Sequence, residues 1–253
     1  MALDPTQRFS NRVDNYVRYR PGYPPELLTV LENEVGLTPS AVVADIGSGT
    51  GISADFFLKN GNTVFAVEPN DAMRAAAESR LHEFPGFHSV DGTAEHTSLP
   101  SESADLVIAA QAFHWFDRPK AKEEFSRILK PGGRIILLWN SRRLDTSPFL
   151  SAYEALVRTY ATDYDRVNHK NIDESIFSDF FSPKGYILIK LFHTEQMGFE
   201  ALQGRLCSAS YMPAENDPRY ADMLRALKNT FDQCESKGVV TMEYDTEVYI
   251  GNP

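Results

Sequence analysis

The chain has 253 residues, a hydrophobic content of 42%, a formal net charge of −10 and a pI near 5.1. This length supports one substantial core with an added subdomain, and the ordinary glycine and proline usage excludes disordered and fibrous classes. A broadly negative surface repels phosphate backbones, so we expect no nucleic-acid partner.

The first 40 residues are expected to form a helical N-terminal cap around a PGYPP turn at 21–25. They include a short basic stretch, RFSNRVDNYVRYR at 8–20, in which arginines alternate with aromatic residues. Such a stretch is usually a solvated helix face. A local binding patch is the alternative.

Residues 41–145 alternate short apolar runs with helical patterns. Runs that are continuously apolar are typical of parallel strands buried on both faces. Each of the three expected helices begins after or at a residue typical of helix starts: Gly51, Asn70 or Pro119. The first ends at Gly61 and the third at Pro131 to Gly133. The pattern predicts a doubly wound α/β core with strands at 41–46, 63–68, 105–110 and 134–139 and helices at 52–61, 71–84 and 119–133.

The remainder of the chain differs in pattern. Residues 146–182 carry aromatic side chains among many charges, which fits either a helical lid or insertion over a pocket or ordinary core packing. Residues 183–253 are expected to complete the sheet. In 241–250 one face carries mostly apolar residues from Met242 to Ile250 and the other carries Glu243, Asp245 and Glu247, which predicts an antiparallel strand with one wet face. The segment 185–195 is its candidate neighbour.

The strongest local signal is VVADIGSGTG at 42–51, where a strand ends at Asp45 and turns through Gly47, Gly49 and Gly51 into a helix. Glycines let a backbone approach a ligand closely. Glu68 ends the next strand, where a carboxylate accepts hydrogen bonds from ribose hydroxyls. Asp45 is placed to repel a pyrophosphate and to hold an ammonium group. An adenosine cofactor with an amino-acid tail is therefore predicted.

These residues, together with three later motifs, resemble the class I S-adenosylmethionine-dependent methyltransferases, and in particular the small-molecule group that includes the ubiquinone-biosynthesis and trans-aconitate types. The later motifs are GTAEHTSLP (92–100), AAQAFHWFD (109–117) and LKPGGR (129–134). The resemblance implies a seven-stranded, mostly parallel sheet with a C-terminal antiparallel strand. It also implies S-adenosyl-L-methionine as cofactor and methyl transfer to a small-molecule acceptor by in-line displacement.

The resemblance also implies roles for individual residues. Asp45, Gly47 and Gly49 would line the methionine end and Glu68 would bind the ribose. Asn70 and Met73 would contact the ribose and adenine, and Thr93 and Ala94 would lie beside the adenine. Gln111 would face the methionine portion and the reactive methyl group. Many relatives carry an acid where Thr93 stands, and Asp91 or Glu95 is the substitute that we consider.

His114, set among aromatic residues directly after a strand, is the candidate catalytic base if the acceptor must lose a proton. A structural histidine bonded to the backbone is the simpler alternative. A carboxylate acceptor would instead need only a cationic clamp, for which Arg142, Arg143 and the arginines of 8–20 are candidates. Asn140 is a further pocket candidate.

Two rival functions remain open at this point. A nicotinamide-dependent reductase is suggested by the Y-x-x-x-K spacing of Tyr186 and Lys190, although that segment has strand character. A cofactor-binding regulator without activity is the other. The nucleophilic atom of the acceptor and the oligomeric state are not predicted.

The sequence lacks the patterns typical of metal-binding, secreted and membrane proteins. The histidines show no spacing typical of a metal site. Two cysteines form no disulfide framework, no apolar signal region precedes the core, and the longest apolar runs are too short to span a bilayer. We expect a cytoplasmic protein with no membrane partner and no metal.

Overall fold

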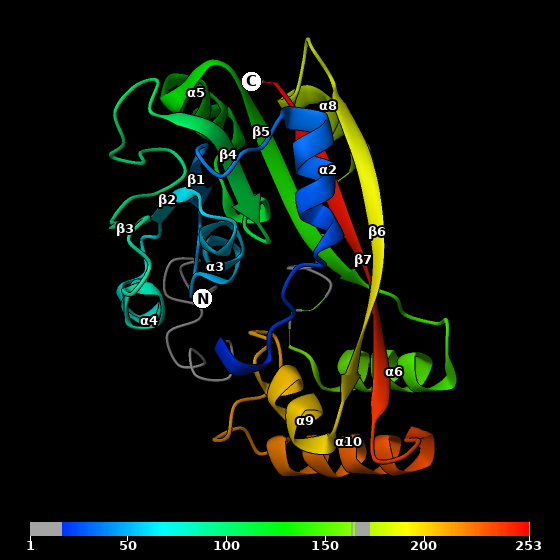
Figure 1. The fold of residues 1–253 in the computed structure, drawn as a ribbon. Coiled ribbons are helices and arrows are strands. Elements are labelled where there is room, and N and C mark those ends of the chain that lie inside the picture. The colour runs from blue at the N-terminus through cyan, green and yellow to red at the C-terminus, as the bar shows by residue number, and fades with distance from the viewer. Residues whose placement is uncertain (1–16, 163, 165–172, 253) are drawn as a thin grey trace.

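A computed structural model describes residues 17–162, 164 and 173–252 and contains one sheet of seven strands, in the order β3-β2-β1-β4-β5-β7-β6 (Figure 1). The first five strands are parallel, and β7 pairs antiparallel with both β5 and β6. The predicted fold class is confirmed, including the antiparallel C-terminal strand. The strands are β1 (Val42–Ile46), β2 (Thr63–Val67), β3 (Phe87–Val90), β4 (Ala104–Ala110), β5 (Leu129–Arg142), β6 (Tyr186–Met197) and β7 (Val240–Gly251).

Helices cover both faces of this sheet, and the alternating side chains of the strands build a core on each face. Val43 and Leu106 pack toward one face and Ala44 and Val107 toward the other, as the period-two geometry of strands requires. The first face is covered by α2 (Glu26–Val35) and α3 (Ile52–Lys59), and the second by α5 (Arg118–Ile128) and α8 (Glu174–Phe180). The helix α4 (Asp71–Leu81) follows β2 and contacts β3, and its Leu81 is buried in the same core as α3.

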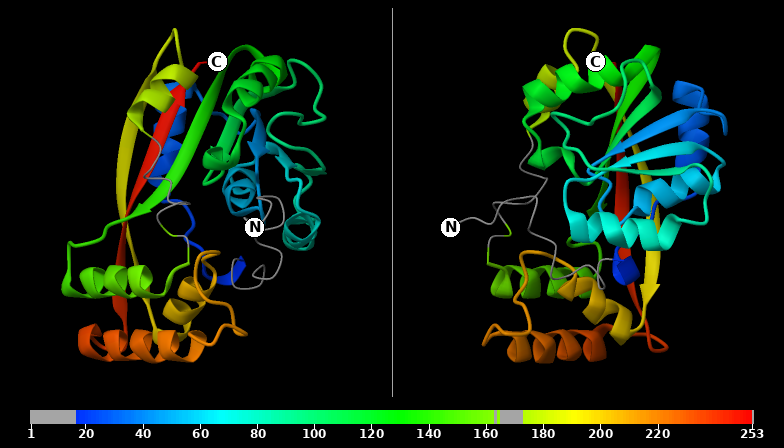
Figure 2. Two further views of the ribbon diagram at one scale, coloured as in Figure 1. Left: turned by 180° about the vertical axis from the view of Figure 1, so that it is seen from behind. Right: turned by 90° about the vertical axis from the view of Figure 1, so that its left-hand side faces the viewer.

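A third core lies beyond the end of the sheet. Figures 1 and 2 show β6 and β7 running past the parallel strands to a group of three helices. These are α6 (Pro148–Tyr160), α9 (Phe199–Cys207) and α10 (Tyr220–Cys234), and their apolar faces pack together with the far ends of β6 and β7. We call this group the helical layer.

The segment 146–182 is divided between two cores. Phe177, Phe180 and Phe181 are buried against the sheet, whereas α6 and Tyr153 belong to the helical layer. Part of the basic stretch at 8–20 and part of the proposed N-terminal cap lie outside the described residues.

The strand β5 begins earlier than its sequence indicates. We expected a helix through Gly133 and a strand from 134, but α5 ends at Ile128 and β5 already pairs Leu129 with Ala104 across an irregularity in the register. Lys130 forms an ion pair with Asp105 at 2.8 Å, which holds this first part of the strand beside β4. The strand β3 was not predicted, because its four residues are partly buried or, at His88, exposed at the sheet edge.

In the described part of the chain, no helix is long and apolar enough to cross a membrane. Cys207 and Cys234 are both free thiols. The strand assignment of the segment that contains Tyr186 and Lys190 is confirmed, since both lie on β6, where Lys190 forms an ion pair with Glu247 at 2.8 Å.

Candidate functional site

A cavity of about 210 Å³ lies between the carboxyl ends of the parallel strands and the helical layer. Gly47, Ser48 and Gly49 of the turn after β1 form part of its wall, and Gln111 and His114 after β4 form another part. Residues from β5, α6, α9 and β7 close the opposite side. The site is therefore assembled from segments that are far apart in the chain.

The turn after β1 depends on glycine at two places for steric reasons. Gly47 has φ of +68°, and a Cβ there would lie 2.7 Å from the Cβ of Ala112. Gly51 has φ of +79°, and a Cβ there would lie 2.5 Å from Cδ1 of Leu81 in α4. The amide of Gly47 also donates to the carbonyl of Val67 at 2.9 Å, so the turn is bonded to β2 as well. These contacts fix the path of the turn, in which Gly47 and Gly49 present backbone without a side chain to the cavity.

Glu68 connects this turn to the next strand end. Its Oε2 accepts a hydrogen bond from the amide of Gly49 and its Oε1 one from the amide of Asn70, both at 2.9 Å. Burial raises the pKa of Glu68, while these two amide donors oppose the rise. Each carboxylate oxygen retains capacity for another donor. Asn70 itself caps α4 as expected, because its side chain accepts from the amide of Met73 at 3.0 Å.

Asp45 is completely buried behind the turn and is only partly satisfied. Its Oδ2 accepts from the hydroxyl of Ser53 at 2.6 Å, and its Oδ1 has no hydrogen-bond partner among the described residues. Burial raises the pKa of Asp45 to about 7, and the nearby charge of Glu68 acts in the same direction. Since buried polar atoms are almost always paired, the site lacks one donor. An ammonium group beside Gly47 and Ser53 would supply that donor, so these residues fit a cofactor with an amino-acid end.

The segment after β4 divides its aromatic residues between core and cavity. Phe113, in the short 3-10 helix η2 (Phe113–Trp115), is fully buried and packs on Phe180 with ring centroids 4.7 Å apart. His114 and Trp115 face the cavity, with ring centroids 4.5 Å apart. Gln111 adopts φ of +59°, which is costly for a residue with a side chain and is often found at functional sites.

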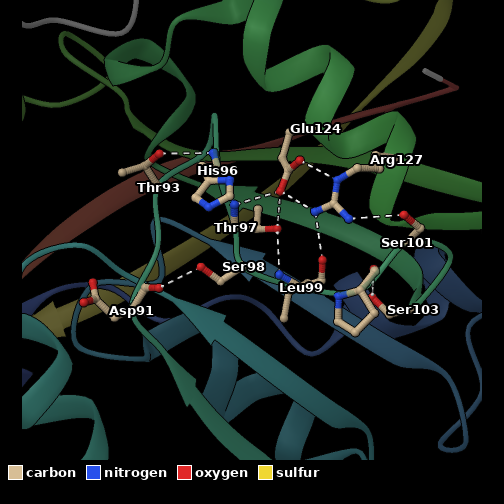
Figure 3. Close-up of polar contacts among 11 residues, drawn as sticks. Asp91, Thr93, His96, Thr97, Ser98, Leu99, Ser101, Ser103, Glu124 and Arg127 are labelled. Atoms are coloured by element: carbon tan, nitrogen blue, oxygen red, sulfur yellow. Dashed lines mark hydrogen bonds and ion pairs between the residues drawn. The ribbon is translucent and has the colours of Figure 1, made fainter.

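An ion pair braces the loop that carries Thr93 and Ala94 (Figure 3). Glu124 of α5 accepts from the backbone amide of Thr97 at 2.7 Å and pairs with Arg127 at 2.7 Å. Arg127 in turn donates to a loop carbonyl, that of Leu99, at 2.8 Å. The sequence analysis missed this brace. The available signal was an acid, Glu124, on the buried face of an otherwise amphipathic helix.

The two acids considered as substitutes at Thr93 are engaged elsewhere. Asp91 lies 3.4 Å from Arg74, and Glu95 accepts from the amide of Asp117 at 2.8 Å. The Thr93 hydroxyl accepts from the amide of His96 at 3.2 Å, within its own loop.

The structure thus places the predicted site residues in three groups. The cavity wall holds Gly47, Gly49, Gln111 and His114. Asp45, Glu68, Asn70 and Met73 are buried directly behind the turn, and the Cε of Met73 lies 3.6 Å from the position of a Cβ on Gly49. Thr93 and Ala94 lie on the braced loop and are not part of the cavity wall.

Three arginines on the cavity wall opposite the turn form its most basic part: Arg20, Arg142 and Arg205. Arg142 was a candidate from the sequence, but its neighbour Arg143 pairs with Asp245 at 2.8 Å and is not among the cavity residues. Arg205 was missed, although a charged residue between the buried Leu202 and Leu206 of α9 was a visible signal.

Asn140 also lies on the cavity wall, where it has a structural role. Its amide donates to the carbonyl of Gly22 at 2.8 Å and its Oδ1 accepts from the hydroxyl of Thr246 at 2.6 Å. Asn140 therefore ties the PGYPP segment to β5 and β7. Among the described residues, no group of acids, histidines and cysteines is arranged to hold a metal ion.

A protein-family model matches the part of the chain that runs from β1 to β5 and includes the glycine turn. Residues 44–137 match a methyltransferase domain model. An uncharacterised methyltransferase of Mycobacterium tuberculosis is 38% identical over 141 residues, covering 55% of this chain and 54% of the relative. An uncharacterised methyltransferase-like protein of Schizosaccharomyces pombe is 30% identical over 156 residues, covering 61% of this chain and 59% of the relative. The chain thus spans a little over half the length of these curated relatives.

Solved structures show the same fold over most of the chain. A candidate type II methyltransferase from Anaeromyxobacter dehalogenans aligns with a TM-score of 0.67 and 22% identity, covering 92% of this chain and 98% of that one. A protein described as a candidate S-adenosyl-L-methionine-dependent methyltransferase from Methanococcus maripaludis aligns with a TM-score of 0.57 and 22% identity, covering 75% and 91%. At this identity the likeness concerns the fold.

Proposed function

We propose that this protein, whose residues 44–137 match a methyltransferase domain model, transfers a methyl group from S-adenosyl-L-methionine to a small-molecule acceptor. The observation that carries the proposal is the position of the cavity. It opens at the carboxyl ends of β1 and β4, where the strand order reverses and where open α/β sheets bind their ligands. The helical layer closes the side of the cavity opposite the turn, which favours a small acceptor over a macromolecule.

The residues behind the turn would hold the cofactor. Asp45 would accept from its ammonium group, for which the unpartnered Oδ1 provides the acceptor. Glu68 would accept from the ribose hydroxyls with the capacity that Gly49 and Asn70 leave on its oxygens. The bound cofactor supplies an electrophilic methyl group on a cationic sulfur.

The cavity wall would organise the acceptor. The aromatic face of Trp115 on this wall would stabilise a cation by about 0.5–2 kcal/mol, and Trp115 and His114 together would exclude water. Alignment of the two reactants provides the larger effect, on the order of 7–11 kcal/mol. His114 is the group placed to accept a proton if the acceptor loses one.

The nicotinamide-dependent alternative draws no support from the site. Tyr186 and Lys190 lie on β6, and neither is among the cavity residues. A binding protein without activity remains the rival that the experiment below addresses.

Titration calorimetry with S-adenosyl-L-methionine and, separately, NADH tests the proposal, followed by detection of S-adenosylhomocysteine after incubation with a library of small acceptors. We expect stoichiometric binding of S-adenosyl-L-methionine and product from at least one acceptor. Binding of NADH alone would overturn the proposal. Cofactor binding without turnover of any acceptor would favour the regulator.

We also propose a cytoplasmic setting, supported by two free thiols, and no nucleic-acid partner, supported by the net charge of −10.

A further inference from the structure

The two edges of the sheet differ in length and in the side chains that they expose. The edge strand β3 has four residues, whereas β6, at the opposite edge, has twelve. A short edge strand limits pairing with other chains, and a long apolar edge strand favours it. Among the described residues, the exposed large hydrophobic side chains all lie on β6: Ile187 at 44%, Leu188 at 41% and Phe192 at 54% exposure. The edge at β6 therefore has the character of an interface.

The backbone of β6 is open to pairing on the side away from β7. The strand pairs with β7 in one continuous antiparallel register, from Tyr186 opposite Gly251 to Met197 opposite Val240. Figures 1 and 2 show no described element beyond β6 in the half of the strand that lies nearest α8. The N–H and C=O groups that point away from β7 match the spacing of another extended strand. The occupant that fits this edge is therefore a β-strand.

The open half of β6 has a sequence that is nearly the same in both directions. It reads YILIKLF at 186–192, with an aromatic residue at each end, an aliphatic residue next to each, and Ile189 at the centre. Two such segments can pair antiparallel about a two-fold axis at Ile189, and residues directly opposite each other then share a face. This register places like side chains together across the two copies: Tyr186 with Phe192, and Ile187 with Leu191.

The aromatic residues at the two ends of this segment are held in place within the chain. The guanidinium group of Arg143 lies over one face of the Phe192 ring, 4.3 Å from the centroid, and leaves the ring half-exposed. Tyr186 packs on Phe181, with ring centroids 5.5 Å apart. Side chains that are ordered in the single copy lose little conformational entropy when a partner binds.

The same segment lacks the acidic side chains that would repel a second copy. The chain has a net charge of −10, so two copies repel each other over much of their surface. Residues 184–192 contain two lysines and no acid. Lys190 forms an ion pair with Glu247 of β7 at 2.8 Å, which neutralises it within its own chain. In the two-fold register the aliphatic part of Lys190 lies opposite Leu188 of the second copy.

We propose that two copies of this protein associate through β6, with residues 186–192 paired antiparallel about Ile189, so that one sheet continues across both copies. Backbone hydrogen bonds between the two strands provide the affinity, and the side chains fix the register. An axis at Lys190 would place two lysines directly opposite each other. An axis at Leu188 would leave Phe192 beyond the paired segment. This inference does not depend on the proposed function.

The mass of the natural chain in solution is the first test. Sedimentation equilibrium at micromolar concentration measures it directly. We expect twice the chain mass of 28.4 kDa. A natural chain that stays at the mass of one copy overturns the inference and leaves the edge to a strand from a different protein.

Two substitutions at one exposed residue test the register. Leu188→Lys places a lysine opposite Lys190 of the second copy on both sides of the axis, and it should raise the Kd of the dimer at least about tenfold. Leu188→Glu places a carboxylate opposite the same lysine and should leave the dimer intact. Net charge alone predicts the reverse order, because the glutamate makes an acidic chain more acidic and the lysine makes it less so. Equal effects of the two substitutions, or a weaker dimer with glutamate than with lysine, overturn the inference.

A lysine placed far from this edge is the matched control. Ala75 is exposed on α4, which contacts the opposite edge strand, β3. Ala75→Lys should remain a dimer with an unchanged Kd, and its dissociation would show that added charge rather than contact at β6 controls association, which overturns the inference. Thermal melting identifies any variant that does not fold. Leu188 is not among the cavity residues, so the affinity for S-adenosyl-L-methionine should be the same in all the variants as in the natural chain.

Discussion

Replacing Asp45 with asparagine should make the stability of the protein less dependent on pH. Burial raises the pKa of Asp45 from 3.8 to about 7, so the folded chain holds this proton more tightly than the unfolded chain does. Stability from this group is therefore complete below about pH 4 and is lost as the pH rises to about 7. Between pH 5 and pH 8 the loss amounts to about 2–3 kcal/mol, at about 1.36 kcal/mol for each pKa unit.

Asp45→Asn has no charge to bury and should escape this loss. Thermal melting of both proteins from pH 5 to pH 8, without cofactor, measures the effect of Asp45 together with its coupling to Glu68, because all other titrating groups are common to the two. We expect the melting temperature of the natural chain to fall by about 5–10 °C relative to the variant across that range. The affinity of the variant for S-adenosyl-L-methionine should also fall, by about 10- to 150-fold, through loss of a charge-assisted hydrogen bond. Parallel melting curves would refute the reasoning about Asp45.

Three further predictions concern other parts of the site. Gly51→Ala should lower the free energy of unfolding by about 1–3 kcal/mol in chemical denaturation, because the new Cβ would lie 2.5 Å from Leu81, and unchanged stability would contradict that packing. Glu124→Gln should weaken the brace in Figure 3. The hydrogen bond and charge of Arg127 lower the pKa of Glu124 to about 2. The natural chain therefore has the stability contributed by the brace above about pH 4.5 and loses it as the pH falls toward 2. A variant whose stability depends on acid pH in the same way would rule the brace out. His114→Ala should lower turnover and leave the cofactor Kd unchanged in calorimetry. Full turnover in the variant would show that His114 has no role in the reaction.

The fold could be predicted because its signals are local. Continuous apolar runs indicated β1, β2, β4 and the middle of β5, and alternation of two faces indicated β7. The turn residues of 42–51 and the cap at Asn70 depend only on neighbours in the chain or on the next strand. Errors arose where distant residues decide the outcome. The start of β5 at Leu129 depends on its pairing with β4, and β3 is too short and too exposed to produce a pattern.

Only one of the two walls of the cavity could be predicted from the sequence. The glycine turn, Gln111 and His114 belong to one continuous motif region, and the structure places them on one wall. The opposite wall combines Arg20, Arg142 and Arg205, which come from three distant segments and meet only because β6 and β7 carry the helical layer past the end of the sheet. No spacing in the sequence relates these residues. The same reason explains why Arg142 and Arg143 were equivalent candidates until the direction of each side chain was known.

The central claim is that the turn formed by residues 47–49 holds S-adenosyl-L-methionine. Titration calorimetry with this cofactor on the natural chain and on Gly47→Val tests it most directly, because a side chain at residue 47 would collide with Ala112 and change the turn. The account predicts stoichiometric binding to the natural chain and a large loss of affinity in a variant that still melts cooperatively. No heat of binding with the natural chain, or equal affinity in both proteins, would contradict it.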